Sequence, residues 1–140
     1  MARLTKIRPI ALGVIVRNNK LLVSKGYDEI KKQTFYRCLG GGIEFQETST
    51  DALKREFIEE IGKEIKIKEL LGISENIFTF NGEGGHEIVF FYSADLKDSD
   101  YQDEYPMIED GENDKAIWMD IDDFKNNKAI VYPVEILKYL

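Results

Sequence analysis

Three glutamates stand close together in the segment KREFIEEIG (54–62), at positions Glu56, Glu59 and Glu60. The spacing of apolar residues around them predicts a helix, which turns by about 100° per residue. The three carboxylates then share an arc of about 100°, with the small side chain of Ala52 inside it. We expect this acidic arc to lie beside an apolar face that packs on the core, and Ala52 to leave room for a ligand.

The charges on this arc are unfavourable unless something compensates them. Glu56 and Glu60 are four residues apart, which costs ~0.2–0.5 kcal/mol for like charges. Glu59 and Glu60 also lie in the last turn, where the helix dipole disfavours anions by ~0.3–1 kcal/mol each. Arg55 is placed to pair with Glu59 but cannot neutralise three carboxylates. An ordinary solvated surface is the alternative, but a bound divalent cation would remove the penalty. Oxygen ligands without Cys or His favour Mg²⁺ or Mn²⁺ over Zn²⁺.

The residues upstream of the glutamates extend the pattern. Gly41 is followed after five residues by Glu47, and seven more residues lead to REFIEEIG (55–62). The whole stretch, GGIEFQETSTDALKREFIEEIG, resembles the signature box of the Nudix hydrolases, the family that includes the MutT-type nucleotide pyrophosphohydrolases. Seven fixed residue types match, and the chance of this at average usage is on the order of one in 10⁸ per starting position. The order of predicted elements resembles the family over most of the chain.

Three positions depart from the family's pattern. Lys63 stands where an aliphatic residue is usual, Leu39 where a proline often begins the loop, and Gln46 where a glycine often precedes the first box glutamate. If Gln46 has a positive φ, it costs ~1 kcal/mol relative to glycine. None of the three removes a carboxylate, so they concern the shape of the loop more than the chemistry.

The resemblance implies a reaction and a catalytic set. Nudix enzymes split a nucleoside diphosphate linked to another group by attack of water at phosphorus, and a cation screens the phosphates and activates the water. Glu59 and Glu60 are the implied main metal ligands. Glu56 is implied to be a ligand, the general base or both, and the identity of the base stays open. The catalytic residues are therefore expected to be Arg55, Glu56 and Glu59.

The remaining box residues have supporting roles in this interpretation. Arg55 is expected to hold Glu59 and Glu47 in place. Glu47 is an orienting residue or a remote metal contact, and Gly41 belongs to the orienting loop. The backbone carbonyl of Gly40 is expected to be a further metal ligand.

A metal ligand from outside the box is expected in the acidic loop ahead of Trp118. Glu112 is favoured by its spacing, and Glu109 and Asp114 are alternatives. Glu87, at the end of a predicted strand, is a further candidate for this metal ligand from another part of the chain.

The substrate phosphates require positive charge. Arg37 lies just before the glycine loop and Lys25 at the end of a predicted hairpin, so both are candidate phosphate-binding residues. The only histidine, His86, is expected to cap a turn or pack at a strand start, and Cys38 to be a small buried residue.

The rest of the chain supplies the elements that must position these residues. The expected elements are a hairpin around 17–20, a strand over 34–39, a glycine loop over 40–47, a helix over 48–62 capped by Ser49 or Thr50 and by Gly62, strands over 64–80 and 86–96, an acidic loop over 97–114, a strand over 115–121, and helical pieces over 122–127 and 133–140 with Pro133 at a first helical position. They predict an α+β layered domain with a mixed, mostly antiparallel sheet. The resemblance implies the Nudix fold, an α/β/α sandwich in which the box forms a loop followed by a helix.

Composition limits the classes of partner. The 140 residues, 43% of them hydrophobic, suggest one domain over 1–140. A formal net charge of -7 argues against long nucleic acid or an anionic membrane, but not against a small phosphorylated substrate that binds with a cation. The single cysteine and the lack of a signal peptide or of a ~20-residue apolar span predict a cytoplasmic protein. Exposed strand edges leave a homodimer open.

The sequence therefore predicts a Mg²⁺-dependent pyrophosphohydrolase that cleaves a diphosphate bond in a nucleotide or nucleoside diphosphate derivative, with Mn²⁺ as a possible substitute. The alternative is a catalytically silent Nudix-fold ligand-binding or sensor module. Such modules tend to lose box glutamates, so the presence of Arg55, Glu56, Glu59 and Glu60 favours the enzyme.

Overall fold

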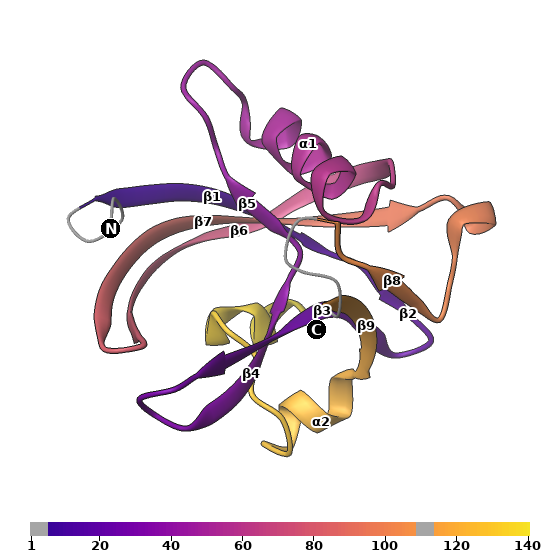
Figure 1. The fold of residues 1–140 in the computed structure, drawn as a ribbon. Coiled ribbons are helices and arrows are strands. Elements are labelled where there is room, and N and C mark those ends of the chain that lie inside the picture. The colour runs from indigo at the N-terminus through magenta and orange to yellow at the C-terminus, as the bar shows by residue number, and fades with distance from the viewer. Residues whose placement is uncertain (1–5, 109–113) are drawn as a thin grey trace.

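The computed structural model describes residues 6–108 and 114–140, and its strands form two sheets (Figure 1). The first sheet has the order β5-β1-β7-β6, with strands β1 (Ile7–Val14), β5 (Gly40–Gly42), β6 (Ile65–Phe80) and β7 (Glu83–Leu96). In this sheet β1 and β7 run parallel, whereas the other pairs are antiparallel. The sheet is therefore mixed, as the sequence predicts.

The second sheet is antiparallel. Its order is β2-β3-β9-β8, and β4 also pairs with β3; the strands are β2 (Val16–Arg17), β3 (Lys20–Asp28), β4 (Gln33–Cys38), β8 (Glu104–Pro106) and β9 (Lys115–Asp120). The predicted hairpin joins β2 to β3 through Asn18 and Asn19, which both have positive φ as a tight hairpin turn requires. The sequence predicts one sheet, and the division into two is a correction, because local patterns do not encode which distant strands pair.

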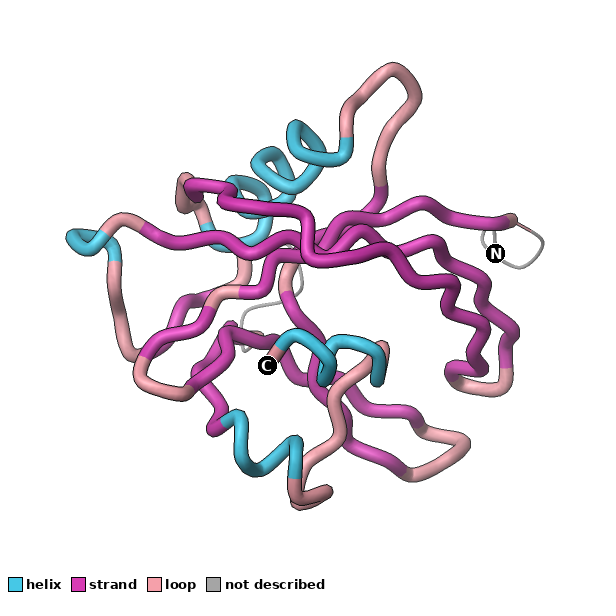
Figure 2. The backbone as a smooth tube through the Cα atoms, turned by 180° about the vertical axis from the view of Figure 1, so that it is seen from behind, coloured by secondary structure: helices cyan, strands magenta, loops and turns pink. Residues whose placement is uncertain are grey.

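Helices flank the two sheets on opposite sides. The main helix, α1 (Ser49–Ile61), covers one side of the first sheet. The C-terminal 3₁₀ helix (Val134–Tyr139) packs against the opposite face of the first sheet, where Tyr139 contacts Phe91 of β7. The short helix α2 (Ile121–Lys125) lies next to the second sheet (Figure 2). No helix in the described part of the chain is long and apolar enough to cross a membrane.

Local capping sets both ends of α1. The side-chain oxygen of Thr48 accepts a hydrogen bond from the N–H of Asp51 at 3.2 Å, so Thr48 is the N-cap and the prediction of Ser49 or Thr50 is wrong by one or two positions. At the other end Gly62 adopts the left-handed conformation with φ 69°, which confirms it as the C-cap.

The core consists of two clusters of buried side chains. The first packs against α1 through Leu53, Phe57 and Ile61. The second lies between the sheets and includes Cys38, whose burial raises the pKa of its thiol to about 12. Ala52 is also fully buried, so it belongs to the packed face of the helix and does not leave the opening that the sequence suggested.

Two further segments differ from expectation. The acidic loop over 97–114 contains a 3₁₀ helix (Asp98–Asp100) and strand β8, both within its described part. Pro133 precedes a 3₁₀ helix as its N-cap and does not begin an α-helix. His86 lies near the start of β7, opposite Ile7 of β1.

Candidate active site

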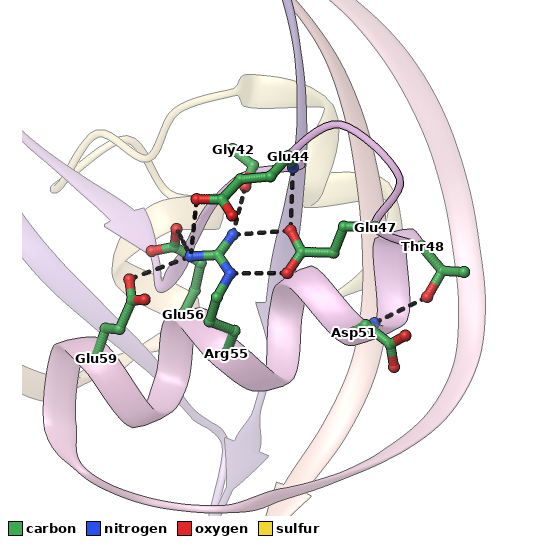
Figure 3. A network of polar contacts seen from close by, with 8 residues as sticks. All are labelled: Gly42, Glu44, Glu47, Thr48, Asp51, Arg55, Glu56 and Glu59. Carbon is green, nitrogen blue, oxygen red and sulfur yellow. Dashed lines mark hydrogen bonds and ion pairs between the residues drawn. The ribbon is translucent and has the colours of Figure 1, made fainter.

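The guanidinium of Arg55 is the centre of the polar network on α1 (Figure 3). Its Nε and Nη2 donate to the two carboxylate oxygens of Glu47 at 2.7 and 2.9 Å, a bidentate ion pair. Its Nη1 donates to Glu56 at 3.0 Å and to Glu59 at 3.1 Å, and Nη2 also donates to the carbonyl oxygen of Gly42 at 2.9 Å. One side chain therefore ties three glutamates of the box to the glycine loop.

This arrangement shifts the pKa values of the partners in opposite directions. The hydrogen bonds from Arg55 lower the pKa of Glu47 to about 2, with help from the N–H of Glu44, which donates to Glu47 at 3.0 Å. The same contacts raise the pKa of Arg55 above its already high value. Both groups therefore stay ionised over the whole range in which an enzyme works.

Stability should depend on pH through Glu47. Because folding lowers the pKa of this carboxyl from 4.5 to about 2, its ionised form stabilises the protein above pH 4.5, and that contribution is lost as the pH falls toward 2. We expect Glu47→Gln to lower the free energy of unfolding at pH 7, and its deficit to shrink by pH 3. Urea unfolding at both pH values measures this. Glu64→Gln, at an exposed ion pair with Lys97, is the control, and a deficit that does not change with pH would contradict the expectation.

The glycine loop lies directly against the glutamates of α1. The N–H of Gly40 donates to Oε1 of Glu60 at 3.0 Å. Gly40 has φ 143°, and a side chain there would collide with the carbonyl oxygen of Ala11. A Cβ at Gly41 would lie 2.5 Å from the carboxyl carbon of Glu56. Gly40 is therefore needed for the close approach of the loop to β1, and Gly41 for the close approach of the loop to the carboxylate of Glu56.

Replacing Gly41 by alanine should therefore reduce turnover. The added methyl group must displace the carboxylate of Glu56, and a misplacement of about 1 Å at a reacting group costs on the order of 10²-fold in rate. Gly84→Ala is the matched control, because a Cβ at Gly84 meets nothing within 4 Å. Steady-state kinetics of the two variants measure the effect, and equal kcat values would show that Glu56 does not need this position.

Gln46 has φ 68° and so adopts the left-handed conformation that the family's glycine suits. The sequence therefore correctly identifies a site of backbone strain, worth ~1 kcal/mol. The adjacent Glu47 is turned toward Arg55, so the loop keeps its shape despite the unfavourable residue.

The donor set on α1 fits a hard divalent cation in chemistry. Glu56, Glu59 and Glu60 supply carboxylate oxygens from one helix, and Glu56 and Glu59 are partly exposed. In the described residues, however, no three acidic, His or Cys side chains stand close enough to form a ready-made metal site. Arg55 contacts Glu56 and Glu59, and the N–H of Gly40 contacts Glu60.

Only some of the candidate metal ligands from outside the box lie in the described residues. Glu112 and Glu109 fall outside the described residues. Asp114 lines a hollow of about 430 Å³ beside β3. Glu87 is buried at 1% exposure and ion-paired with two arginines, which makes it a poor cation ligand.

The two expected phosphate-binding cations are not brought together. Arg37 lines a cavity of about 420 Å³, whereas Lys25 lines the separate hollow that contains Asp114. That hollow also includes Met107, whose neighbour Ile108 donates its N–H to the carbonyl oxygen of Glu60 at 2.8 Å. Lys25 therefore lies toward the C-terminal end of α1, and Arg37 lies between the sheets.

The cavity beside Arg37 is walled by aromatic rings. Phe35 contacts Phe80 edge-on and Tyr132 at a tilt, with centroid distances of 5.8 and 5.5 Å. These rings come from β4, the end of β6 and the segment before the C-terminal 3₁₀ helix. The three segments are far apart along the chain, so no local pattern in the sequence predicts that these rings meet.

A hydrogen-bonded clasp between two hairpin tips includes Asp28, which lines this cavity. The buried carboxylate of Asp28 accepts the N–H groups of Lys31 at 2.9 Å and of Asn81 at 3.2 Å, and these bonds lower its pKa. Asn81 in turn accepts the N–H of Glu29 at 2.8 Å. The tip of the β6–β7 hairpin is thus tied to the β3–β4 turn, and both views place the two tips together (Figures 1 and 2).

Arg8 is the residue near the site that sequence analysis missed. Its side chain lines a hollow with Gly42, Glu44 and Glu56, and its guanidinium pairs with Glu87 at 3.5 Å. The parallel register of β1 and β7 places Arg8 directly opposite Glu87. No local signal in the sequence predicts this pairing.

Comparison with known proteins defines the class of the molecule. A model of the NUDIX domain matches residues 7–139, so the chain belongs to the Nudix family. Members of this family generally cleave nucleoside diphosphate derivatives and generally use divalent metals. The protein is a Nudix-type hydrolase acting on phosphorus-containing acid anhydrides, which confirms the family and the enzyme class expected from the sequence.

Solved structures share the fold at low sequence identity. A Nudix hydrolase from Nitrosomonas europaea is similar with a TM-score of 0.68 and 21% identity, covering 95% of this chain and 85% of that one. A Nudix-family hydrolase from Clostridium perfringens has a TM-score of 0.67 and 19% identity, covering 96% and 93%. A MutT Nudix hydrolase from Burkholderia pseudomallei has a TM-score of 0.59 and 23% identity, covering 84% and 85%. Comparison with curated protein sequences finds no match.

Proposed function

We propose that the protein is a Mg²⁺-dependent pyrophosphohydrolase that cleaves a diphosphate bond in a nucleotide or another nucleoside diphosphate derivative, with Mn²⁺ as a substitute. The observation that carries this proposal is the packing of the box around the glycine loop. Arg55 contacts Glu47, Glu56 and Glu59, and Glu60 is bonded to Gly40. Arg55 and Gly40 thereby tie these carboxylates to the glycine loop.

In this proposal Glu56, Glu59 and Glu60 hold the cation, with Glu112 as a ligand from outside the box and the carbonyl of Gly40 as a backbone ligand. A bound divalent cation screens the phosphate charge and lowers the pKa of a coordinated water. The donor chemistry supports Mg²⁺, because every proposed ligand is an oxygen.

The chain's own residues have separate tasks. Arg55 holds the glutamates in register with the loop. Glu56, whose side chain is 17% exposed and lies against Gly41, is the glutamate that we propose as acceptor of a proton from the attacking water. Arg37 binds substrate phosphate, and Lys25 contributes positive charge from the other side of β3.

The substrate is small and phosphorylated, as the family implies. The proposal takes it to be a nucleotide, acted on by one catalytic domain over residues 1–140 in the cytoplasm. The buried thiol of Cys38 suits a reducing compartment. The long edge strand β6 leaves a homodimer open.

A substrate panel tests the proposal. Nucleoside triphosphates, ADP-ribose, dinucleoside polyphosphates, nucleotide sugars and RNA 5′ ends are incubated with Mg²⁺, with Mn²⁺ or with EDTA, and the products are identified by mass. We expect cleavage at a diphosphate bond of at least one compound, abolished by EDTA. Turnover that survives EDTA would refute the cation requirement. Melting shifts without any product across the panel would favour the silent ligand-binding module.

A further inference from the structure

A buried carboxylate lies between two arginines at the junction of the two sheets. Glu87 of β7 is 2% exposed at its side chain and accepts from Nη2 of Arg37 at 2.9 Å. On its other oxygen it faces Nη1 of Arg8 at 3.5 Å. The two guanidinium groups outnumber the carboxylate, so the trio carries a net charge of +1.

The two arginines remain accessible although the glutamate does not. The side chain of Arg8 is 37% exposed and that of Arg37 is 32% exposed. A guanidinium has five N–H donors in a planar fork, and the ion pair with Glu87 engages only part of each fork. Both arginines can therefore bind a second anion while Glu87 holds them in place.

The position of the trio relates it to the candidate active site. Arg8 reaches the hollow that contains Glu56, and its Nη2 lies 3.3 Å from where a Cβ on Gly42 would be. Arg37 reaches the aromatic cavity. A chain of positive charge thus runs from the glutamates of α1 to that cavity, across a protein whose net charge is -7.

We propose that Arg8 and Arg37 form a two-arginine site for the diphosphate group of the substrate, with Glu87 as the buried positioning residue between them. This inference rests on the proposed function for the identity of its ligand. Arginine suits the role because its fork matches phosphate oxygens in a bidentate manner. Glu87 compensates the charge repulsion between the two guanidinium groups when no substrate is bound.

Binding of inorganic pyrophosphate tests the site without turnover. Calorimetric titrations compare wild type, Arg8→Gln and Arg37→Gln, each in Mg²⁺ and in EDTA. We expect each variant to raise Kd by about 10-fold or more, as for loss of a charge-assisted hydrogen bond. Arg8→Lys, which keeps the charge but not the fork, should fall between wild type and Arg8→Gln. No binding by wild type at millimolar pyrophosphate, or equal Kd values in the wild type and both glutamine variants, would overturn the proposal.

Arg17→Gln is the matched control. Arg17 is also a partly buried arginine in an ion pair, with Asp98 at 3.1 Å, and it bonds the carbonyl oxygen of Leu96. Leu96 is nine residues along β7 from Glu87, about 30 Å at the usual rise of a strand. Arg17→Gln should therefore affect stability but leave the pyrophosphate Kd unchanged. A rise in Kd equal to that of Arg8→Gln and Arg37→Gln would show that the effects of those two variants come from a general loss of positive charge.

A double-mutant cycle tests the role of Glu87. If Glu87 positions Arg8, the effect of Arg8→Gln on the pyrophosphate Kd should shrink to within about 3-fold in a Glu87→Gln background. A purely structural tie between the sheets would lower the melting temperature and leave the two effects independent. Full additivity would therefore refute the positioning role.

Kinetics separate this inference from the proposed function. With the substrate that the panel identifies, Arg8→Gln should raise KM more than it lowers kcat. If the panel shows no cleavage but pyrophosphate binding depends on both arginines, the anion site stands and the proposed reaction fails. If turnover requires Glu59 while Arg8→Gln and Arg37→Gln leave Kd and KM unchanged, the reaction stands and the anion site fails.

Discussion

Replacing Glu59 by glutamine should lower kcat/KM by at least about 100-fold while the protein stays folded. The proposed role of Glu59 is to supply negative charge to the bound cation, and the amide of glutamine cannot do so. Loss of a residue that only orients a metal ligand already costs 10–100-fold, so loss of a ligand should cost at least as much. The side chain is 42% exposed and its ion pair with Arg55 is an i,i+4 surface contact, worth only ~0.3–0.5 kcal/mol.

The measurement needs both kinetics and a test of folding. Steady-state assays with Mg²⁺ give kcat/KM, and thermal unfolding shows whether the variant keeps its structure. Glu64→Gln, an exposed glutamate just past the end of α1 that pairs with Lys97 at 3.3 Å, controls for the loss of one negative charge. Wild-type turnover in Glu59→Gln would exclude Glu59 as an essential ligand.

Replacement of Arg55 should damage both stability and turnover. Arg55→Ala removes the hydrogen bonds that Arg55 donates to Glu47, Glu56, Glu59 and the carbonyl oxygen of Gly42. Hydrogen bonds to charged groups contribute about 1.5–3 kcal/mol, so we expect a loss of this order in the free energy of unfolding. Turnover should fall by about 10–100-fold or more, because the glutamates lose the side chain that orients them.

Arg55→Lys separates charge from geometry. Lysine keeps the positive charge but cannot form the bidentate pair with Glu47 and reach the Gly42 carbonyl at the same time. We expect it to recover part of the stability and little of the activity. Urea unfolding and kinetics of both variants, with Arg17→Lys as the control at a remote ion pair, measure this. Full activity in Arg55→Lys would show that charge alone suffices.

Local pattern was sufficient to predict α1. The helix, its C-cap at Gly62 and the contact between Arg55 and Glu59 all depend on residues within one or two turns of each other. The strain expected at Gln46 came from the resemblance, because the family often has a glycine there, and the structure gives this residue a positive φ. Periodicity and capping are local effects, so a sequence carries them directly.

Tertiary structure alone decided which distant residues meet. Arg8, Arg37 and Glu87 come together only because β1 pairs with β7 in a parallel register and β4 lies in the other sheet. The clasp between Asp28 and Asn81 depends in the same way on two hairpins that are 53 residues apart. Strand pairing is set by the sum of many weak side-chain contacts across the sheet, and no single stretch of sequence records it. The sequence by itself therefore determined the family, the helix and the carboxylates, while the placement of positive charge around them was decided by the packing of the two sheets.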